Sequence, residues 1–65
     1  MKFIQVTEKE KNLRVLIPVD KILSITQSRD LTAIIDTHTD KNGDVYAIYT
    51  KELYLEIVKQ IRELA

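Results

Sequence analysis

The chain has 65 residues, its ten basic and ten acidic side chains cancel to a formal net charge of zero, and it contains no cysteine. A neutral chain lacks the basic surface of a nucleic-acid or membrane-surface binder. The absence of cysteine excludes disulfides and thiolate metal sites. A chain of this length builds one small core, so we expect residues 1–65 to form a single domain.

The amino terminus reads Met-Lys-Phe-Ile-Gln-Val-Thr, which lacks the apolar segment of a signal peptide. No apolar run approaches the length that a membrane-spanning helix needs. We therefore expect a cytoplasmic protein that makes no contact with a membrane.

Two alternating segments, residues 3–7 and 13–19, predict the first β-hairpin. A four-residue loop between them would place Val6 opposite Leu13 and join the two apolar faces, whereas a five-residue loop would pair Ile4 with Leu16 and mix the faces. We prefer the four-residue loop. It leaves Phe3 and Leu16 together on the opposite face of the hairpin. The shared apolar face would consist of Ile4, Val6, Leu13, Val15, Ile17 and Val19.

Three more strands are expected at residues 22–28, 31–37 and 44–49. Pro18 has no amide to donate, so it belongs at a strand end or on a sheet edge. For the last hairpin, a two-residue Asn-Gly turn would set polar positions opposite apolar ones. We prefer a three-residue loop with Gly43 in the left-handed region, because it gathers one apolar face. That face would consist of Leu31, Ala33, Ile35, Val45, Ala47 and Tyr49.

The segment from Thr50 to Ala65 predicts an amphipathic helix with Thr50 as its N-cap. Its apolar stripe would consist of Leu53, Tyr54, Ile57, Val58, Ile61 and Leu64. Since everything before this segment reads as strands and turns, the helix is the element available to cover a sheet. The expected fold is therefore α+β: a five-stranded antiparallel β-meander with one C-terminal amphipathic helix packed on it.

Few residues of this chain are of a type that binds a metal ion or takes part in catalysis. Asp36, His38 and Asp40 alternate along one strand end and would point the same way, which is a pattern that could hold a metal ion. We interpret them instead as the solvated tip of a polar hairpin. One histidine, one glycine and no cysteine leave no nucleophile–base pair and no phosphate-binding loop. We expect no enzymatic activity, no catalytic residue, no cofactor and no metal site.

Leu55 lies away from the apolar stripe of the predicted helix, between Lys51, Lys59 and Arg62. A single exposed leucine is ordinary on a protein surface. The alternative is that Leu55 contacts a partner. A second, independent candidate for contact with a partner is the outer face of the first hairpin, which carries Phe3 and Leu16. The candidate interface therefore consists of Phe3, Leu16 and Leu55.

Several stretches resemble the FlbD-like family of very short cytoplasmic proteins: residues 1–7, 15–25, 49–52 and 56–58. The resemblance covers nearly the whole chain and rests on its apolar pattern. It implies a few strands followed by a short helix, and it points towards a flagellar context. The chain departs from that pattern at Pro18, where such sequences often carry asparagine.

A second, more local resemblance is to the amino-terminal half of the LytTR DNA-binding domain. Residues 19–25, the hairpin around Gly43 and residues 53–61 follow its order of strand, hairpin and helix. The later half of that family, with its basic DNA-contacting loops, has no counterpart in these residues. No DNA-contacting residue is therefore transferred to this chain.

Two functions are compatible with these patterns. The favoured hypothesis is a non-enzymatic protein-interaction module that forms a homodimer and docks on an unidentified protein partner. The alternative is a nucleic-acid-binding module, which would rest on the LytTR-like order and the flank of Lys51, Lys59 and Arg62. A salt-dependent shift with a nucleic acid would distinguish the two, because phosphate contacts release counterions.

Overall fold

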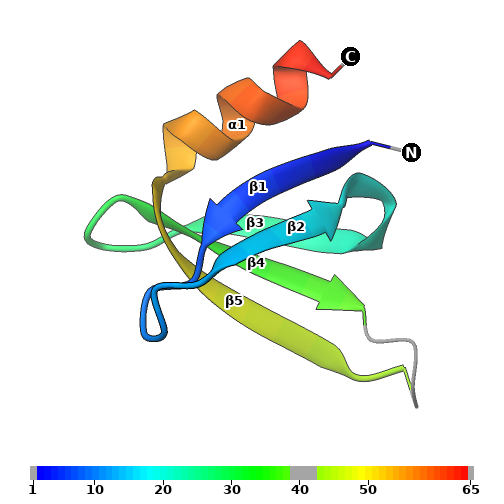
Figure 1. The fold of residues 1–65 in the computed structure, drawn as a ribbon, viewed down its shortest axis with the longest axis horizontal. Coiled ribbons are helices and arrows are strands. Elements are labelled where there is room, and N and C mark those ends of the chain that lie inside the picture. The colour runs from blue at the N-terminus through cyan, green and yellow to red at the C-terminus, as the bar shows by residue number, and fades with distance from the viewer. Residues whose placement is uncertain (1, 39–42, 65) are drawn as a thin grey trace.

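A computed structural model describes residues 2–38 and 43–64 of the chain. Within these ranges it has five strands, a short 3-10 helix and one α-helix (Figure 1). The elements in order are β1 (Phe3–Thr7), β2 (Arg14–Pro18), η1 (Val19–Lys21), β3 (Ile22–Gln27), β4 (Thr32–His38), β5 (Val45–Leu53) and α1 (Tyr54–Glu63). The expected α+β class, with antiparallel strands followed by one C-terminal helix, is confirmed.

The strands form two sheets, one of β1 and β2 and one in the order β3-β4-β5. Consecutive strands are neighbours within each sheet, as in a meander, but β2 does not pair with β3. The reason is η1, which turns the chain directly after Pro18 and carries β3 into the second sheet. In Figure 1 the β1–β2 ribbon lies over the three-stranded sheet, and α1 runs beside β1.

Main-chain hydrogen bonds join the two sheets at one end. Glu8 forms an antiparallel bridge with Thr50, and the Lys9 amide donates a 2.8 Å hydrogen bond to the Tyr49 carbonyl. The far end of the ribbon is held by Lys2, whose ammonium group donates to the Leu64 carbonyl at the end of the helix. These contacts fix the ribbon across the sheet.

The first hairpin has neither the four-residue nor the five-residue loop considered from sequence. Val6 lies opposite Val15 and Thr7 opposite Arg14, so residues 8–13 form the loop. This loop is closed by hydrogen bonds from Glu8 to Leu13 and from Asn12 to Glu8, and Asn12 adopts a left-handed φ of 55°. The register differs from the predicted one by two residues, so the apolar faces still coincide. Leu13, however, is 57% exposed and lies outside the core.

The last hairpin also departs from the predicted register, here by one residue. Ile35 lies opposite Ile48, and Ile34 lies opposite Tyr49. A shift of one residue exchanges the two faces of a strand, so Ile48 and Thr50 are buried while Tyr49 is exposed. Val45 and Ala47, also expected inside, are exposed as well. Gly43 has the expected left-handed φ of 69°, while Lys41 and Asn42 of the predicted loop lie outside the described residues.

The core lies between the ribbon, the three-stranded sheet and the helix. Partly buried side chains from β2, η1, β3 and α1 surround it. Its buried apolar residues are Ile4, Val6, Ile17, Ala33, Ile35, Ile48 and Ile57. Only Ile57 among them comes from the helix, which therefore acts as a lid whose stability depends on docking.

The helix begins three residues later than predicted, at Tyr54 with Leu53 as its N-cap in place of Lys51 with Thr50. Thr50 is not its N-cap; it is a fully buried residue of β5, whose hydroxyl donates a 2.8 Å hydrogen bond to the Ala33 carbonyl. The N-cap is Leu53, which offers no side-chain hydrogen bond and is 43% exposed. The Tyr54 amide donates instead to the Leu31 carbonyl at 2.8 Å. A tertiary contact thus replaces the local cap that the sequence suggested.

The outer edge of β1 is closed by side chains. The Gln60 amide group accepts a hydrogen bond from the Gln5 amide and donates one to the Gln5 carbonyl, both at 3.0 Å. Two residues further along, the Glu52 carboxylate accepts from the Thr7 amide at 2.7 Å and from its hydroxyl at 2.9 Å. These side chains occupy the positions that a further strand would take, so β1 is protected from pairing with another chain.

Substitutions on the helix test this assignment of the core. Ile57→Ala should lower the free energy of unfolding by about 2–5 kcal/mol, because it leaves a cavity in the core. Leu53→Ala should cost about 1 kcal/mol or less, since that side chain is largely accessible to water. Glu63→Ala, at an exposed site, should stay within about 0.5 kcal/mol. Urea midpoints measure all three, and equal losses for Ile57 and Leu53 would contradict the observed helix start.

A second test concerns the closed edge of β1. Gln60→Ala should lower the free energy of unfolding by about 1–2 kcal/mol, because two hydrogen bonds to the Gln5 main chain are lost. Hydrogen exchange at the Gln5 amide should accelerate, whereas exchange at the Val6 amide should change only with global stability. Lys59→Ala, at the neighbouring exposed position, is the control and should leave both amides unchanged. An unaltered Gln5 exchange rate in the Gln60 variant would refute the contact.

Candidate functional site

The main-chain groups of β2 provide an edge that is open to another strand. In an antiparallel ladder, hydrogen-bonded and non-hydrogen-bonded pairs alternate. The bonds from Glu8 to Leu13 and from Val19 to Lys2 fix which residues of β2 face β1. The amides and carbonyls of Arg14 and Leu16 must then point away from β1, and none of residues 2–38 and 43–64 donates to or accepts from them.

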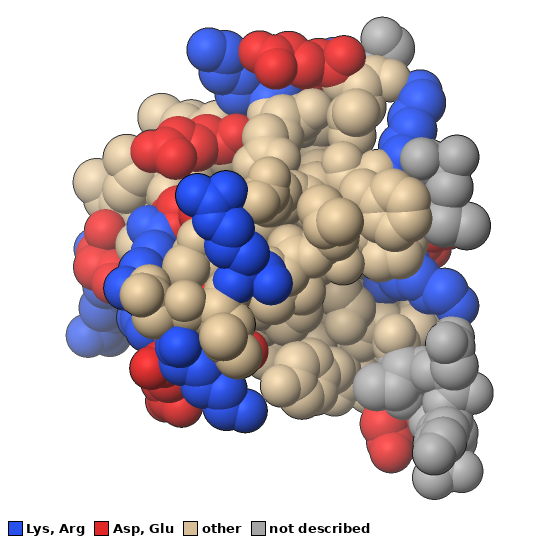
Figure 2. Space-filling model, viewed as in Figure 1, with Lys and Arg blue, Asp and Glu red and all other residues tan. Residues whose placement is uncertain are grey.

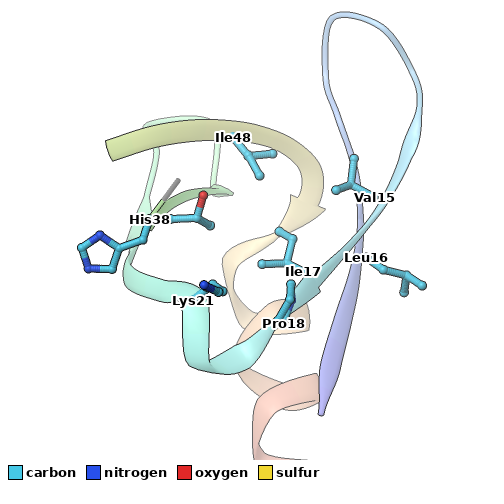
Figure 3. Close-up of a pocket in the computed structure, with 8 residues that line it drawn as sticks. Val15, Leu16, Ile17, Pro18, Lys21, His38 and Ile48 are labelled. Carbon is cyan, nitrogen blue, oxygen red and sulfur yellow. The ribbon is translucent and has the colours of Figure 1, made fainter. Parts of the chain in front are cut away.

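A groove of about 250 Å³ runs along this edge, between the ribbon and the three-stranded sheet. Figure 3 shows Ile17 and Ile48 directed towards each other across it, and the Leu16 side chain on the opposite face of β2 from Ile17. Its wall is mainly apolar, and Lys21 and His38 form its polar end. The lining residues are Val15, Leu16, Ile17, Pro18, Lys21, Thr37, His38 and Ile48.

The outer face of the ribbon brings together two of the three predicted interface residues. Phe3 pairs with Pro18 and Gln5 with Leu16, so Phe3 and Leu16 are diagonal neighbours on one face. Phe3 is 43% and Leu16 is 65% exposed. Figure 2, in the orientation of Figure 1, shows an uncharged area in the middle of this side of the molecule, with charged side chains at its margins. The expected pairing of Phe3 and Leu16 on the outer face is therefore found.

Leu55 is 72% exposed on α1 and belongs to a different surface. The helix meets β1 through Gln60, and five residues at 3.6 per turn place Leu55 about 140° around the axis from Gln60. Leu55 therefore lies on the flank of the helix that is turned away from β1. The structure does not join it to Phe3 and Leu16.

The basic flank considered for nucleic-acid binding is not one helical surface. Lys51 belongs to β5, and its ammonium group donates a 2.6 Å hydrogen bond to the Asn12 side chain. Lys59 lies 4.0 Å from the Glu63 carboxylate one turn further along α1. Lys51 therefore lies outside the helix, while Lys59 and Arg62 remain exposed on α1.

The polar residues near the last hairpin, between β4 and β5, do not assemble a metal centre in the described part of the chain. Asp36 accepts a 3.0 Å hydrogen bond from the Ser24 hydroxyl, while His38 ends β4 and is exposed. Asp40, the third residue of the predicted pattern, lies outside the described residues. No group of three histidine, aspartate or glutamate side chains that could hold a metal ion occurs within 2–38 and 43–64.

A polar cluster ties the first loop to the turn between β3 and β4. The Asp30 carboxylate accepts hydrogen bonds from the Lys9 ammonium group at 2.7 Å and from the hydroxyl and amide of Thr32. The bond from Lys9, followed by those from Thr32, holds the pKa of Asp30 well below its ordinary value. The cluster lies on the surface and connects two turns, so we assign it a structural role.

Sequence reasoning identified the outer face but missed the groove and the open edge. Pro18 was the available signal, because it marked a strand end or a sheet edge. The missing information was that η1 would separate β2 from β3 and leave β2 unpaired. Comparisons with protein-family models, curated proteins and solved structures found no match. In the described residues, the helices are too short or too polar to cross a membrane.

The Asp30 cluster predicts a pH dependence with a definite sign. A pKa that is lowered in the folded state stabilises the fold above the unfolded value of about 3.9, and this stabilisation is lost as the pH falls through the folded pKa. Lys9→Met should raise the Asp30 pKa towards its ordinary value without fully restoring it, since the bonds from Thr32 remain. The stability difference from wild type should be present at neutral pH and shrink in acid.

Carboxyl carbon NMR shifts of Asp30 would measure this titration directly. Lys11→Met, in the same loop, is the matched control and should leave the Asp30 titration curve in place. An Asp30 pKa that is the same in the Lys9 variant and in wild type would show that the ion pair does not persist in solution.

Proposed function

We propose that this chain is a non-enzymatic protein-interaction module that self-associates as a homodimer. The observation that carries the proposal is the pair of exposed apolar side chains on the outer face of the β1–β2 ribbon, where Phe3 and Leu16 are diagonal neighbours beside the unpaired edge of β2. Apolar side chains that gather on one face are typical of a surface that contacts another protein.

The size of the domain supports self-association. A chain of about 60 residues buries only about 60% of the surface exposed in its unfolded state, which leaves a small margin of stability. This chain has no cysteine that could add a disulfide. A second copy adds buried area without any covalent link, and small domains commonly gain stability in this way.

The symmetry of the dimer follows from the use of a single surface. Isologous contact about a two-fold axis lets one patch bind its own copy, and it is the commonest arrangement among soluble oligomers. The formal net charge of zero also means that two copies do not repel each other through net charge.

The cellular context belongs to the same proposal. We propose a cytoplasmic location, which rests on the resemblance to the FlbD-like family of very short cytoplasmic proteins. A further protein partner would bind the assembled dimer. The resemblance to the FlbD-like family supports a small cytoplasmic module and provides a flagellar context in which to look for that partner.

Light scattering after size exclusion tests the homodimer directly. Wild type should run at twice the monomer mass of 7.6 kDa, whereas Phe3→Glu and Leu16→Glu should run as monomers because each buries a charge at the contact. Leu55→Glu is the matched control, since it places the same charge on a different exposed leucine, and it should remain a dimer.

Two outcomes would contradict this proposal. A wild type that stays monomeric over a wide range of concentrations would exclude self-association. A dimer that resists Phe3→Glu and Leu16→Glu but dissociates with Leu55→Glu would move the contact to the flank of α1.

A further inference from the structure

We propose that the partner of the open β2 edge is β2 of a second copy, paired antiparallel about a two-fold axis at Leu16. This inference rests on the proposed self-association and adds the element that makes the contact and its register. The result would be a continuous four-stranded sheet in the order β1-β2-β2-β1.

The open edge has the right number of main-chain groups for such pairing. The amides and carbonyls of Arg14 and Leu16 point outward and have no partner within the described residues. With Leu16 on the axis, each Leu16 amide donates to the Leu16 carbonyl of the other copy. Each Arg14 amide then donates to the Pro18 carbonyl of the other copy. Four hydrogen bonds would form. The amides of Arg14 and the amides and carbonyls of Leu16 are unpaired in the monomer, whereas the Pro18 carbonyl already accepts the first i→i+3 bond of η1 and would use its second lone pair.

Pro18 favours this register. It ends β2 and has no amide, so the edge carries a carbonyl but no donor at that position. In the proposed register Pro18 needs only its carbonyl, which accepts from Arg14 of the other copy. The overlap then covers all of β2, from Arg14 to Pro18. A shift by two residues would pair Arg14 with Leu16 and leave Pro18 outside the ladder.

The charges near the edge fit the same arrangement. Asp20 follows Pro18 in η1 and is exposed, and Arg14 is exposed at the other end of β2. Antiparallel pairing brings Arg14 of one copy near Asp20 of the other, on both sides of the axis. Asp20 lies in η1, beyond the end of β2, so this would be an attraction between exposed charges at the margin of the contact and not a cross-strand pair. The two carboxylates and two guanidinium groups would thus favour the two-fold arrangement.

The other open edges fit a second copy less well. Beside β5, Glu8 and Glu10 line a hollow with Tyr46, Ala47, Ile48 and Tyr49, and charged side chains at an edge disfavour pairing. A β3 pair centred on Ile25 would place Lys21 opposite Arg29, which sets like charges against each other. Neither conflict occurs at β2.

Pairing at β2 also explains the side chains on both faces of the ribbon. A two-fold axis perpendicular to the sheet keeps each face on its own side, so the two Leu16 side chains would be direct cross-strand neighbours on the outer face. Phe3 of each copy would extend that apolar row. On the inner face, the grooves lined by Val15, Ile17 and Ile48 would lie next to each other and shield one another from water.

Leu16→Pro tests the main-chain contact with little disturbance of the monomer. The Leu16 amide faces away from β1, so its removal costs no bond inside the ribbon, and proline is accepted at such edge positions. The variant should keep the circular dichroism of wild type and raise the dimer dissociation constant at least 100-fold. Leu16→Ala keeps the amide and trims the side chain, so it should weaken the dimer about tenfold or less.

Hydrogen exchange on the wild type provides a second measurement that needs no variant. The Arg14 and Leu16 amides should exchange rapidly at concentrations where the protein is monomeric and slowly where it is dimeric. The Val15 amide, which lies in the β1–β2 ladder, should be protected under both conditions. This measurement tests the pairing of the two β2 strands even if Leu16→Pro fails to fold.

The possible failures can be told apart. A wild type that is monomeric at all concentrations contradicts the proposed self-association itself. A dimer in which Arg14 and Leu16 exchange as fast as in the monomer refutes pairing at β2 but leaves self-association in place. Equal losses of dimer with Leu16→Pro and Leu16→Ala, without amide protection, would assign the contact to side chains of the outer face alone.

Discussion

The hydrogen bonds that Gln60 and Glu52 make to β1 determine how the rest of the molecule is arranged. A two-stranded ribbon has two edges, and in this chain one of them is bonded to side chains from α1 and from the end of β5. These bonds hold the helix beside the ribbon, so that Ile57 reaches the core between the two sheets. They also decide which edge remains available, because β1 is occupied and β2 is not.

The division of the strands into two sheets has a separate origin, the turn that follows β2. A single five-stranded meander would have paired β2 with β3 and left one face to be covered by a short helix. Instead η1 follows Pro18 and turns the chain, so the ribbon itself covers the sheet together with α1. Ile4 and Ile17 from the ribbon thereby meet Ile35 and Ile48 from the sheet. A small chain obtains a two-layered core in this way, with few residues committed to the helix.

Local patterns in the sequence were sufficient for part of this arrangement. The alternation of Ile4 and Val6 placed β1 correctly, and the spacing of Ile57, Ile61 and Leu64 identified the inner stripe of the helix. Both signals depend only on neighbours along the chain. The outer face with Phe3 and Leu16 also followed, because a register error of two residues preserves the faces of a strand.

The remaining errors concern contacts between distant residues. Thr50 is a good N-cap by type, but its hydroxyl bonds to Ala33 across the sheet, and β5 continues to Leu53. Tyr49 was assigned to the apolar face because the predicted three-residue loop paired it with Ile35, yet the register set by β4 buries Ile48 instead. The groove exists because β2 and β3 do not pair, and no pattern within one strand predicts this.

The occupied edge of β1 limits how many copies can join. A sheet that joined two copies through β2 would end in a blocked β1 strand on either side, so assembly along this direction would stop at two copies and could not continue into a filament.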